Sequence, residues 1–176
     1  MRNSSKRLKL LVGLVLLQVI VLLGLAFSYI AVDWYGKEIR LETAPVDPRD
    51  LFYGDYVILN YEISRLPDEM WHGGAAQPER GQRAYVLLRP STEHPELYEA
   101  AGIYDERPDA GTEDVVLKAR VEYAWDGNIE LTYGFERYYV PEGTGKALEE
   151  QRENMQVAIK VAPWGQAKLS RLIIQP

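Results

Sequence analysis

The N-terminal part of the chain contains one uninterrupted apolar run, from Leu10 to Val32. The run has 23 residues and no charge, and only Gln18 and Ser28 carry strongly polar side chains. As a helix it would measure about 34 Å, more than the roughly 30 Å hydrocarbon core of a bilayer. Because the run is apolar on every side rather than along one stripe, residues 10–32 are predicted to form a transmembrane helix embedded in the lipid bilayer.

A cleaved signal peptide is the alternative interpretation of this run. The apolar region of a signal peptide normally has about 7–15 residues, fewer than are present here. Ala26, Phe27 and Ser28 loosely match a small-x-small cleavage site. The length favours an uncleaved anchor, and Trp34 and Tyr35 follow where interfacial aromatic side chains are common.

Beyond residue 33 the pattern changes to short segments that alternate between apolar and polar residues, which predicts β-strands. The clearest is Tyr56–Ile63, whose odd-numbered residues are apolar or aromatic and are expected to face a core: Val57, Leu59, Tyr61 and Ile63. Asp126, Gly127 and Asn128 separate two further segments and are a hairpin signal. The other predicted strands are residues 39–43, 83–89, 115–125, 129–133, 137–140, 156–161 and 168–174.

Four other segments are predicted to be irregular or helical. Residues 67–82 are rich in glycine and proline and predict an exposed, mobile loop. Residues 91–112 are acidic and broken by prolines and glycines, with a helical turn expected at 95–101. Single-turn and surface-helix patterns occur at 47–50 and 143–154. Together these patterns predict a mainly β fold, a small β-barrel or sandwich with one short helix, after an N-terminal transmembrane helix.

The charge distribution divides the chain into regions and predicts its topology. The net charge of −6 combines four basic residues before the apolar run with 16 basic and 26 acidic residues from Asp33 onward, a formal −10. The predicted regions are a basic cytoplasmic tip (1–9), the transmembrane helix (10–32), a membrane-proximal linker with an entry strand (33–46) and an exported β-rich domain (47–176). A domain this acidic is expected to bind neither nucleic acid nor anionic lipid. With no cysteine, it has no disulfide.

One octapeptide has a recognisable motif. Residues 54–61 read G-D-Y-x-x-L-x-Y, in which the specified positions are Gly54, Asp55, Tyr56, Leu59 and Tyr61. The chain therefore resembles the bacterial GDYXXLXY protein family, and residues 47–51 and 133–143 are also similar to it. The resemblance implies a membrane-anchored bacterial protein without a defined activity. With the charge distribution, this places the protein in the bacterial inner membrane, with the domain in the periplasm or outside the cell. The resemblance also implies a partner, a multi-spanning membrane protein.

The motif and its surroundings provide candidate binding residues. Asp55 or Glu136 could pair with Arg49 or Arg137, and such an arginine–carboxylate pair would hold two loops together. The same residues could instead bind a ligand carboxylate. For the motif itself, turn geometry at Gly54 and core packing at Leu59 and Tyr61 provide a structural explanation.

The sequence contains no recognisable set of catalytic residues. The spacing from Pro48 to Gly54 and Asp55 is similar to that of a motif in bacterial signal peptidases. The position of their nucleophilic serine falls on Pro45 or Val46, whose side chains cannot attack a carbonyl. A non-catalytic relative of that barrel stays an alternative. His72 and His94 lie in dissimilar polar loops, and the acidic residues 105–114 lack the ligand spacing of an EF-hand. No catalytic residue, metal site or cofactor is predicted.

The favoured function is therefore that of a membrane-anchored accessory or interaction protein without enzymatic activity. The alternative is an exported ligand-binding or sensory domain, since 12 tyrosines and four tryptophans could line a pocket. A cleft around the candidate residues would favour this alternative.

Overall fold

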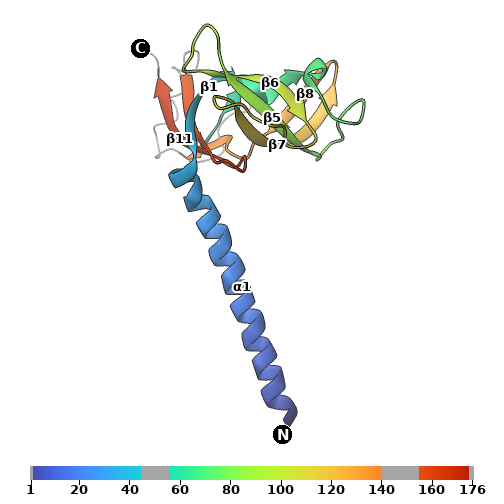
Figure 1. Ribbon diagram of the computed structural model, residues 1–176, viewed down its shortest axis with the longest axis vertical. Coiled ribbons are helices and arrows are strands. Elements are labelled where there is room, and N and C mark those ends of the chain that lie inside the picture. Colours follow the sequence, from blue (N-terminus) through green and yellow to red (C-terminus); the bar gives the residue numbers. More distant parts are fainter. Residues whose placement is uncertain (1, 45–55, 140–154, 175–176) are drawn as a thin grey trace.

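The computed structural model describes residues 2–44, 56–139 and 155–174, which form one long helix and a β-rich domain (Figure 1). Helix α1 (Arg2–Tyr35) extends as a rod from the domain, and most of its apolar side chains contact no other part of the chain. Residues Lys6–Tyr35 are long and apolar enough to cross a bilayer, a criterion that an N-terminal signal sequence also meets.

The strands form a nearly closed, barrel-like arrangement in which all neighbouring strands within the sheets are antiparallel. The four-stranded sheet has the order β11 (Ala167–Ile174), β10 (Met155–Val161), β1 (Lys37–Ala44) and β3 (Asn60–Tyr61). The five-stranded sheet has the order β4 (Arg65–Pro67), β8 (Asn128–Thr132), β7 (Val115–Trp125), β5 (Arg83–Pro90) and β6 (Tyr98–Tyr104). A two-stranded ribbon pairs β2 (Tyr56–Ile58) with β9 (Arg137–Tyr139), and two 3₁₀ turns, η1 (Glu62–Ser64) and η2 (Asp68–Met70), flank β4.

The core lies between the two larger sheets, because each turns its alternate apolar side chains inward. The four-stranded sheet contributes branched aliphatic residues from β1 and β10, and the five-stranded sheet contributes them from β5, β7 and β8. The central members are at most 2% exposed: Ile39, Leu41, Val157, Ile159, Val86, Leu88, Leu117, Val121, Ile129 and Leu131.

The mainly β prediction with an N-terminal apolar helix is confirmed. The predicted hairpin is confirmed too: β7 and β8 are joined at Asp126 and Gly127, whose φ angles of 53° and 71° suit a tight two-residue hairpin turn. The strands predicted at 39–43, 83–89, 156–161 and 168–174 correspond to β1, β5, β10 and β11.

Two local predictions were wrong. The expected helical turn at 95–101 overlaps β6 instead, because pairing with β5 imposes extended backbone on an acidic segment whose local composition does not favour it. Tyr56–Ile63 is not one strand: β2 pairs with β9, β3 pairs with β1, and η1 follows. Its predicted core side was nevertheless right for Leu59, Tyr61 and Ile63, all at most 5% exposed.

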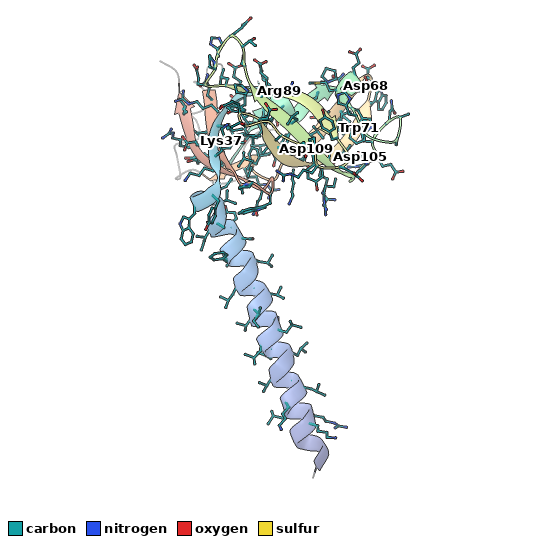
Figure 2. The ribbon with its side chains drawn as sticks, in the orientation of Figure 1. Lys37, Asp68, Trp71, Arg89, Asp105 and Asp109 are labelled. Carbon is teal, nitrogen blue, oxygen red and sulfur yellow. The ribbon has the colours of Figure 1, made fainter. Side chains whose placement is uncertain are left out.

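The other predicted segments are a mobile loop, a single helical turn and a surface helix. The loop predicted at 67–82 begins later, because Pro67 ends β4 and residues 68–70 form η2. Residues 71–82 have no helix or strand. They are held by hydrogen bonds from the Trp71 indole to the Ala75 carbonyl (2.8 Å) and from the Gly74 amide to the Asp105 carboxylate (2.8 Å). Figure 2 shows Trp71 and Asp105 together, at the end of the domain far from α1. The turn predicted at 47–50 and the helix predicted at 143–154 lie outside the described residues.

Candidate interaction site at the junction of helix and domain

The two family-like segments lie side by side in space, although more than 70 residues separate them in sequence. Strand β2, from the octapeptide, pairs with β9 in the register Tyr56 to Tyr139 and Ile58 to Arg137. The Leu59 amide then donates to the Glu136 carbonyl oxygen at 2.7 Å. The segments that resemble the family therefore form one structural unit. We call its described residues, 56–61 and 133–139, the family segment.

Tyr61, the last specified residue of the motif, belongs to the interior of this unit. Its side chain is 1% exposed, and its hydroxyl donates to the Phe135 carbonyl oxygen at 2.9 Å. The rings of Tyr61 and Phe135 pack with centroids 5.1 Å apart. Burial, with a smaller effect from the Glu136 carboxylate, raises the pKa of Tyr61 far above its ordinary value. Tyr61 is therefore a neutral structural residue.

Glu136 holds the turn that leads into β9. Its carboxylate accepts hydrogen bonds from the amides of Tyr133 and Gly134, the latter at 2.9 and 3.1 Å to its two oxygens. Gly134 has a φ of 87°, which a side chain would strain. The Tyr133 hydroxyl donates to the Ile63 carbonyl oxygen at 2.5 Å, and burial raises the pKa of Tyr133. These contacts make Glu136 an internal brace for the turn.

The structure describes two of the four predicted binding residues. Glu136 and Arg137 are adjacent at the start of β9, and both line a cleft. Arg49, Gly54 and Asp55 lie outside the described residues, as does the Tyr56 side chain, so the predicted pairing of Arg49 or Asp55 with them stays a prediction.

The cleft has a volume of about 730 Å³ and lies where helix, ribbon and sheet meet. We call it the junction cleft. The segment after β8 and strand β9 form one wall, and β11 forms the other. One lining residue, Tyr29, comes from α1. The others are Thr132, Gly134, Phe135, Glu136, Arg137, Tyr138, Ala167, Lys168, Leu169 and Ser170.

Ionic contacts fix the helix to the domain beside this cleft. Lys160 and Lys168 are directly opposed on β10 and β11, and both approach Asp33 near the end of α1. The Lys168 ammonium is 2.8 Å from one Asp33 carboxylate oxygen and 4.8 Å from the centre of the Tyr29 ring, while Lys160 is 3.8 Å from the other oxygen. The hydrogen bond to Asp33 raises the pKa of Lys168.

Apolar packing reinforces the same connection. Ala31 and Val32 are 5% and 0% exposed, unlike the residues that precede them, so the last turns of the helix pack on the domain. Gly36 alone separates α1 from β1, and its amide donates to the Val32 carbonyl oxygen at 2.9 Å. A Cβ at Gly36 would collide with that oxygen. The helix therefore enters the sheet without a flexible linker.

Sequence reasoning missed Tyr29, Asp33, Lys160 and Lys168 as site residues. A signal was present, because the strands predicted at 156–161 and 168–174 flank a short turn and would place the two lysines opposite each other. The position of Asp33 between them depends on the docking of the helix, which no local pattern reveals.

A second cleft, of about 280 Å³, lies between β1, η1 and β6. We call it the acidic cleft. Glu42, Glu62 and Glu99 line it. Burial and the nearby carboxylates of Glu42 and Glu99 raise the pKa of Glu62. Within the residues that the structure describes, no group of three or more His, Asp or Glu side chains has a metal-binding arrangement.

Comparison with known proteins gives one match. The family model described as GDYXXLXY protein matches residues 18–172, which includes part of α1 and nearly all of the β-domain. No curated protein and no solved structure matches the chain.

Proposed function

The chain belongs to the GDYXXLXY protein family, and from this premise we propose that it is a single-pass, membrane-anchored accessory protein without enzymatic activity, whose β-domain binds another membrane protein. The observation that carries the proposal is the composition of the junction cleft. The cleft combines Tyr29 of the apolar helix with Glu136, Arg137 and Tyr138 of the family segment. A partner seated there contacts both the anchor and the domain.

The rigid connection between α1 and β1 supports this role. Buried Val32, the close approach at Gly36 and the ion pairs of Asp33 hold the domain in one orientation relative to the helix. An interaction surface with a fixed height above a bilayer suits a partner that is itself embedded in the membrane. A partner in solution would place no such demand on the orientation.

The proposed location is the bacterial inner membrane, with the N-terminus in the cytoplasm and the domain in the periplasm or outside the cell. The support is the distribution of charge, because Arg2, Lys6, Arg7 and Lys9 precede the apolar run and no acidic residue does. Accessibility of the domain to protease in spheroplasts, but not in inverted vesicles, tests this topology.

Site-specific photo-crosslinking in native membranes tests the partner. A photoreactive residue at exposed Ser170 in the junction cleft is expected to capture one discrete integral membrane protein. The control places the same group at Asp109 (Figure 2), which is exposed, lies between β6 and β7 and does not line the cleft. Identical products from both positions, or no product from Ser170, would contradict the proposal.

A ligand-binding domain is the second candidate, and the junction cleft is the observation that favours it. Its volume of about 730 Å³ falls within the range of small-molecule sites, and Arg137 and Lys168 supply cationic groups for an anionic ligand. Under this candidate, small carboxylates raise the melting temperature of the full-length chain, and Arg137→Gln abolishes the increase. An accessory protein shows no such increase.

A further inference from the structure

The outer surface of the five-stranded sheet carries a concentration of positive charge within an acidic domain. A cleft of about 290 Å³ there is lined by Arg83 on β5 and by Lys118 and Arg120 on β7. The other lining residues are Ala119, Thr132, Tyr133 and Gly134, so none of the described lining residues is acidic. The nearby Glu136 carboxylate is bonded to the amides of Tyr133 and Gly134. We call this the basic cleft. It stands out because the chain from Asp33 onward has a formal charge of −10.

The three cations of the basic cleft lack carboxylate partners in the described part of the chain. Arg120 donates to the carbonyl oxygen of Gly81 at 2.9 Å, a neutral acceptor. Arg83 is directly opposite Arg120 in the antiparallel register, an arrangement in which like charges repel. Arg80, by contrast, pairs with Glu122 at 2.8 Å. An external anion would neutralise the repulsion that the fold leaves in place.

The basic cleft is close to the membrane anchor. Thr132 and Gly134 line both this cleft and the junction cleft, which contains Tyr29 of α1. The Lys118 amide also donates to the carbonyl oxygen of Gly165 at 2.9 Å, in the turn between β10 and β11. Figure 1 shows β7 and this turn on the side of the domain from which the helix extends. The positive charge therefore lies on the side that faces the bilayer if the helix spans it.

The same surface of β7 continues into exposed aromatic side chains. A register shift between Val121 and Tyr123 reverses the alternation, so Tyr123 and Trp125 point outward like Lys118 and Arg120 while Ala124 packs on the core. Tyr123 is 50% exposed and Trp125 is 78% exposed. Tryptophan and tyrosine are typical of surfaces at the membrane–water interface. The Glu130 carboxylate lies beside Tyr123, so the positive charge on this surface is that of the basic cleft.

We propose that the basic cleft binds the phosphate groups of anionic phospholipids in the leaflet from which the helix emerges, and that β7 thereby rests on the membrane surface. This inference rests on the anchoring in the proposed function. It departs from the expectation drawn from net charge, because the force on a surface at close range depends on the charges that face it and not on their sum over the domain.

The chemical reactivity of the Lys118 amine tests the proposal. The full-length chain is reconstituted in nanodiscs of phosphatidylcholine alone and of phosphatidylcholine with phosphatidylglycerol, and lysines are labelled with a water-soluble acylating reagent and quantified by mass spectrometry. In the anionic nanodiscs Lys118 is expected to react about fivefold more slowly. Lys37 begins β1 just after the helix (Figure 2) and does not line the basic cleft, so its reactivity is expected to change little.

Variants separate binding in the cleft from a general effect of surface potential. Arg83→Gln with Arg120→Gln is expected to remove most of the protection of Lys118. Arg80→Gln with Arg89→Gln removes the same charge from residues outside the cleft, which pair with Glu122 and Asp114, and is expected to retain the protection. Equal loss in both double variants would overturn the proposal.

Other outcomes of the labelling experiment would indicate free phosphate or an acidic protein as the ligand, or a failure of the anchoring. Protection of Lys118 by inorganic phosphate in phosphatidylcholine nanodiscs, equal to that from phosphatidylglycerol, would show a site for free phosphate and overturn the lipid assignment. Protection in native membranes but not in anionic nanodiscs would show an acidic protein partner and would overturn it too. Failure of the chain to incorporate into either nanodisc contradicts the anchoring itself, whereas incorporation with unchanged Lys118 reactivity contradicts only this inference.

Discussion

The polar groups of the family segment and those of the outer face of β7 differ in their hydrogen-bond and ionic partners. In the family segment, the hydroxyl of Tyr61, the hydroxyl of Tyr133 and the carboxylate of Glu136 all bond to the chain's own backbone. On the outer face of β7, the described contacts leave Lys118 without a carboxylate partner and Arg120 bonded only to a neutral carbonyl.

This difference shows that Tyr61, Tyr133 and Glu136, which lie in the described part of the family segment, are not the residues that the fold leaves available. A side chain whose hydrogen bonds are all internal stabilises the structure, and binding a ligand through it would first require breaking those bonds. Exposed cations without internal partners contribute little to stability but can bind an external anion. The functional surface is therefore expected next to the motif rather than within it.

Truncation of Tyr61 is the strongest test of this contrast. Tyr61→Ala is expected to lower the free energy of unfolding by about 3–5 kcal/mol, because a buried aromatic side chain leaves a cavity. Tyr61→Phe, which loses only the hydroxyl, is expected to cost about 1 kcal/mol. Urea unfolding of the full-length chain in detergent micelles measures both. Tyr123→Ala, at a 50% exposed position on β7, is expected to change stability by less than about 0.5 kcal/mol, and a similar loss at both tyrosines would remove the contrast.

Substitution of Glu136 tests whether its carboxylate stabilises the turn or binds a partner. Glu136→Ala is expected to cost about 1–2 kcal/mol, since two backbone amides lose a charged acceptor in a partly exposed turn. Glu136→Gln, which keeps an acceptor oxygen, is expected to cost less. The same urea unfolding measures these values. A Glu136→Ala variant with unchanged stability but without the Ser170 cross-link would assign Glu136 to binding instead.

Substitution on the outer face is expected to have a small effect of the opposite sign. Arg83→Gln relieves the repulsion from Arg120 and should raise the free energy of unfolding by about 0.2–0.5 kcal/mol. The matched control is Arg171→Gln, which breaks the pair with Glu38 at 2.7 Å and should lower it by about 0.2–1 kcal/mol. Destabilisation by Arg83→Gln would mean that the basic cleft has a structural role.

The acidic cleft provides the smallest expected effect, and it depends on pH. The pKa of Glu62 is raised in the folded state, so folding favours its protonated form and ionisation costs stability as pH rises above the ordinary carboxyl range. Glu62→Gln should therefore raise stability at pH 7, by less than about 0.5 kcal/mol because solvent screens this exposed group. The gain should disappear below about pH 4. Thermal unfolding measured across this range, with exposed Glu93→Gln as control, would contradict the interpretation if the gain were independent of pH.

Local patterns predicted the strands well where pairing partners are close in sequence. The β7–β8 hairpin follows from alternation on both sides of Asp126 and Gly127, and β10 and β11 follow from two apolar segments around a short turn. Prediction failed at β6, whose extended backbone depends on β5, and at residue 59, where the chain leaves β9 and joins β1. At both places a contact between distant residues overrides local preference.

The candidate site was predicted less completely than the fold. Glu136 and Arg137 were identified and do line the junction cleft, but the described role of Glu136 is to brace a turn. Tyr29, Asp33 and Lys168 come from a helix and a strand that meet only because Val32 docks on the domain. The predicted pairing with Arg49 or Asp55 stays a prediction.

By itself, the sequence determined that a helix long and apolar enough to span a bilayer precedes a β-rich, acidic domain, because helix length, apolarity and alternation are local properties of the chain. It also determined the family, through five specified residues in one octapeptide. Only the tertiary structure decided which charges share a surface. Strand pairing gathered Arg83, Lys118 and Arg120 on one face and Glu42, Glu62 and Glu99 at another, and a sum over the sequence contains no information about either.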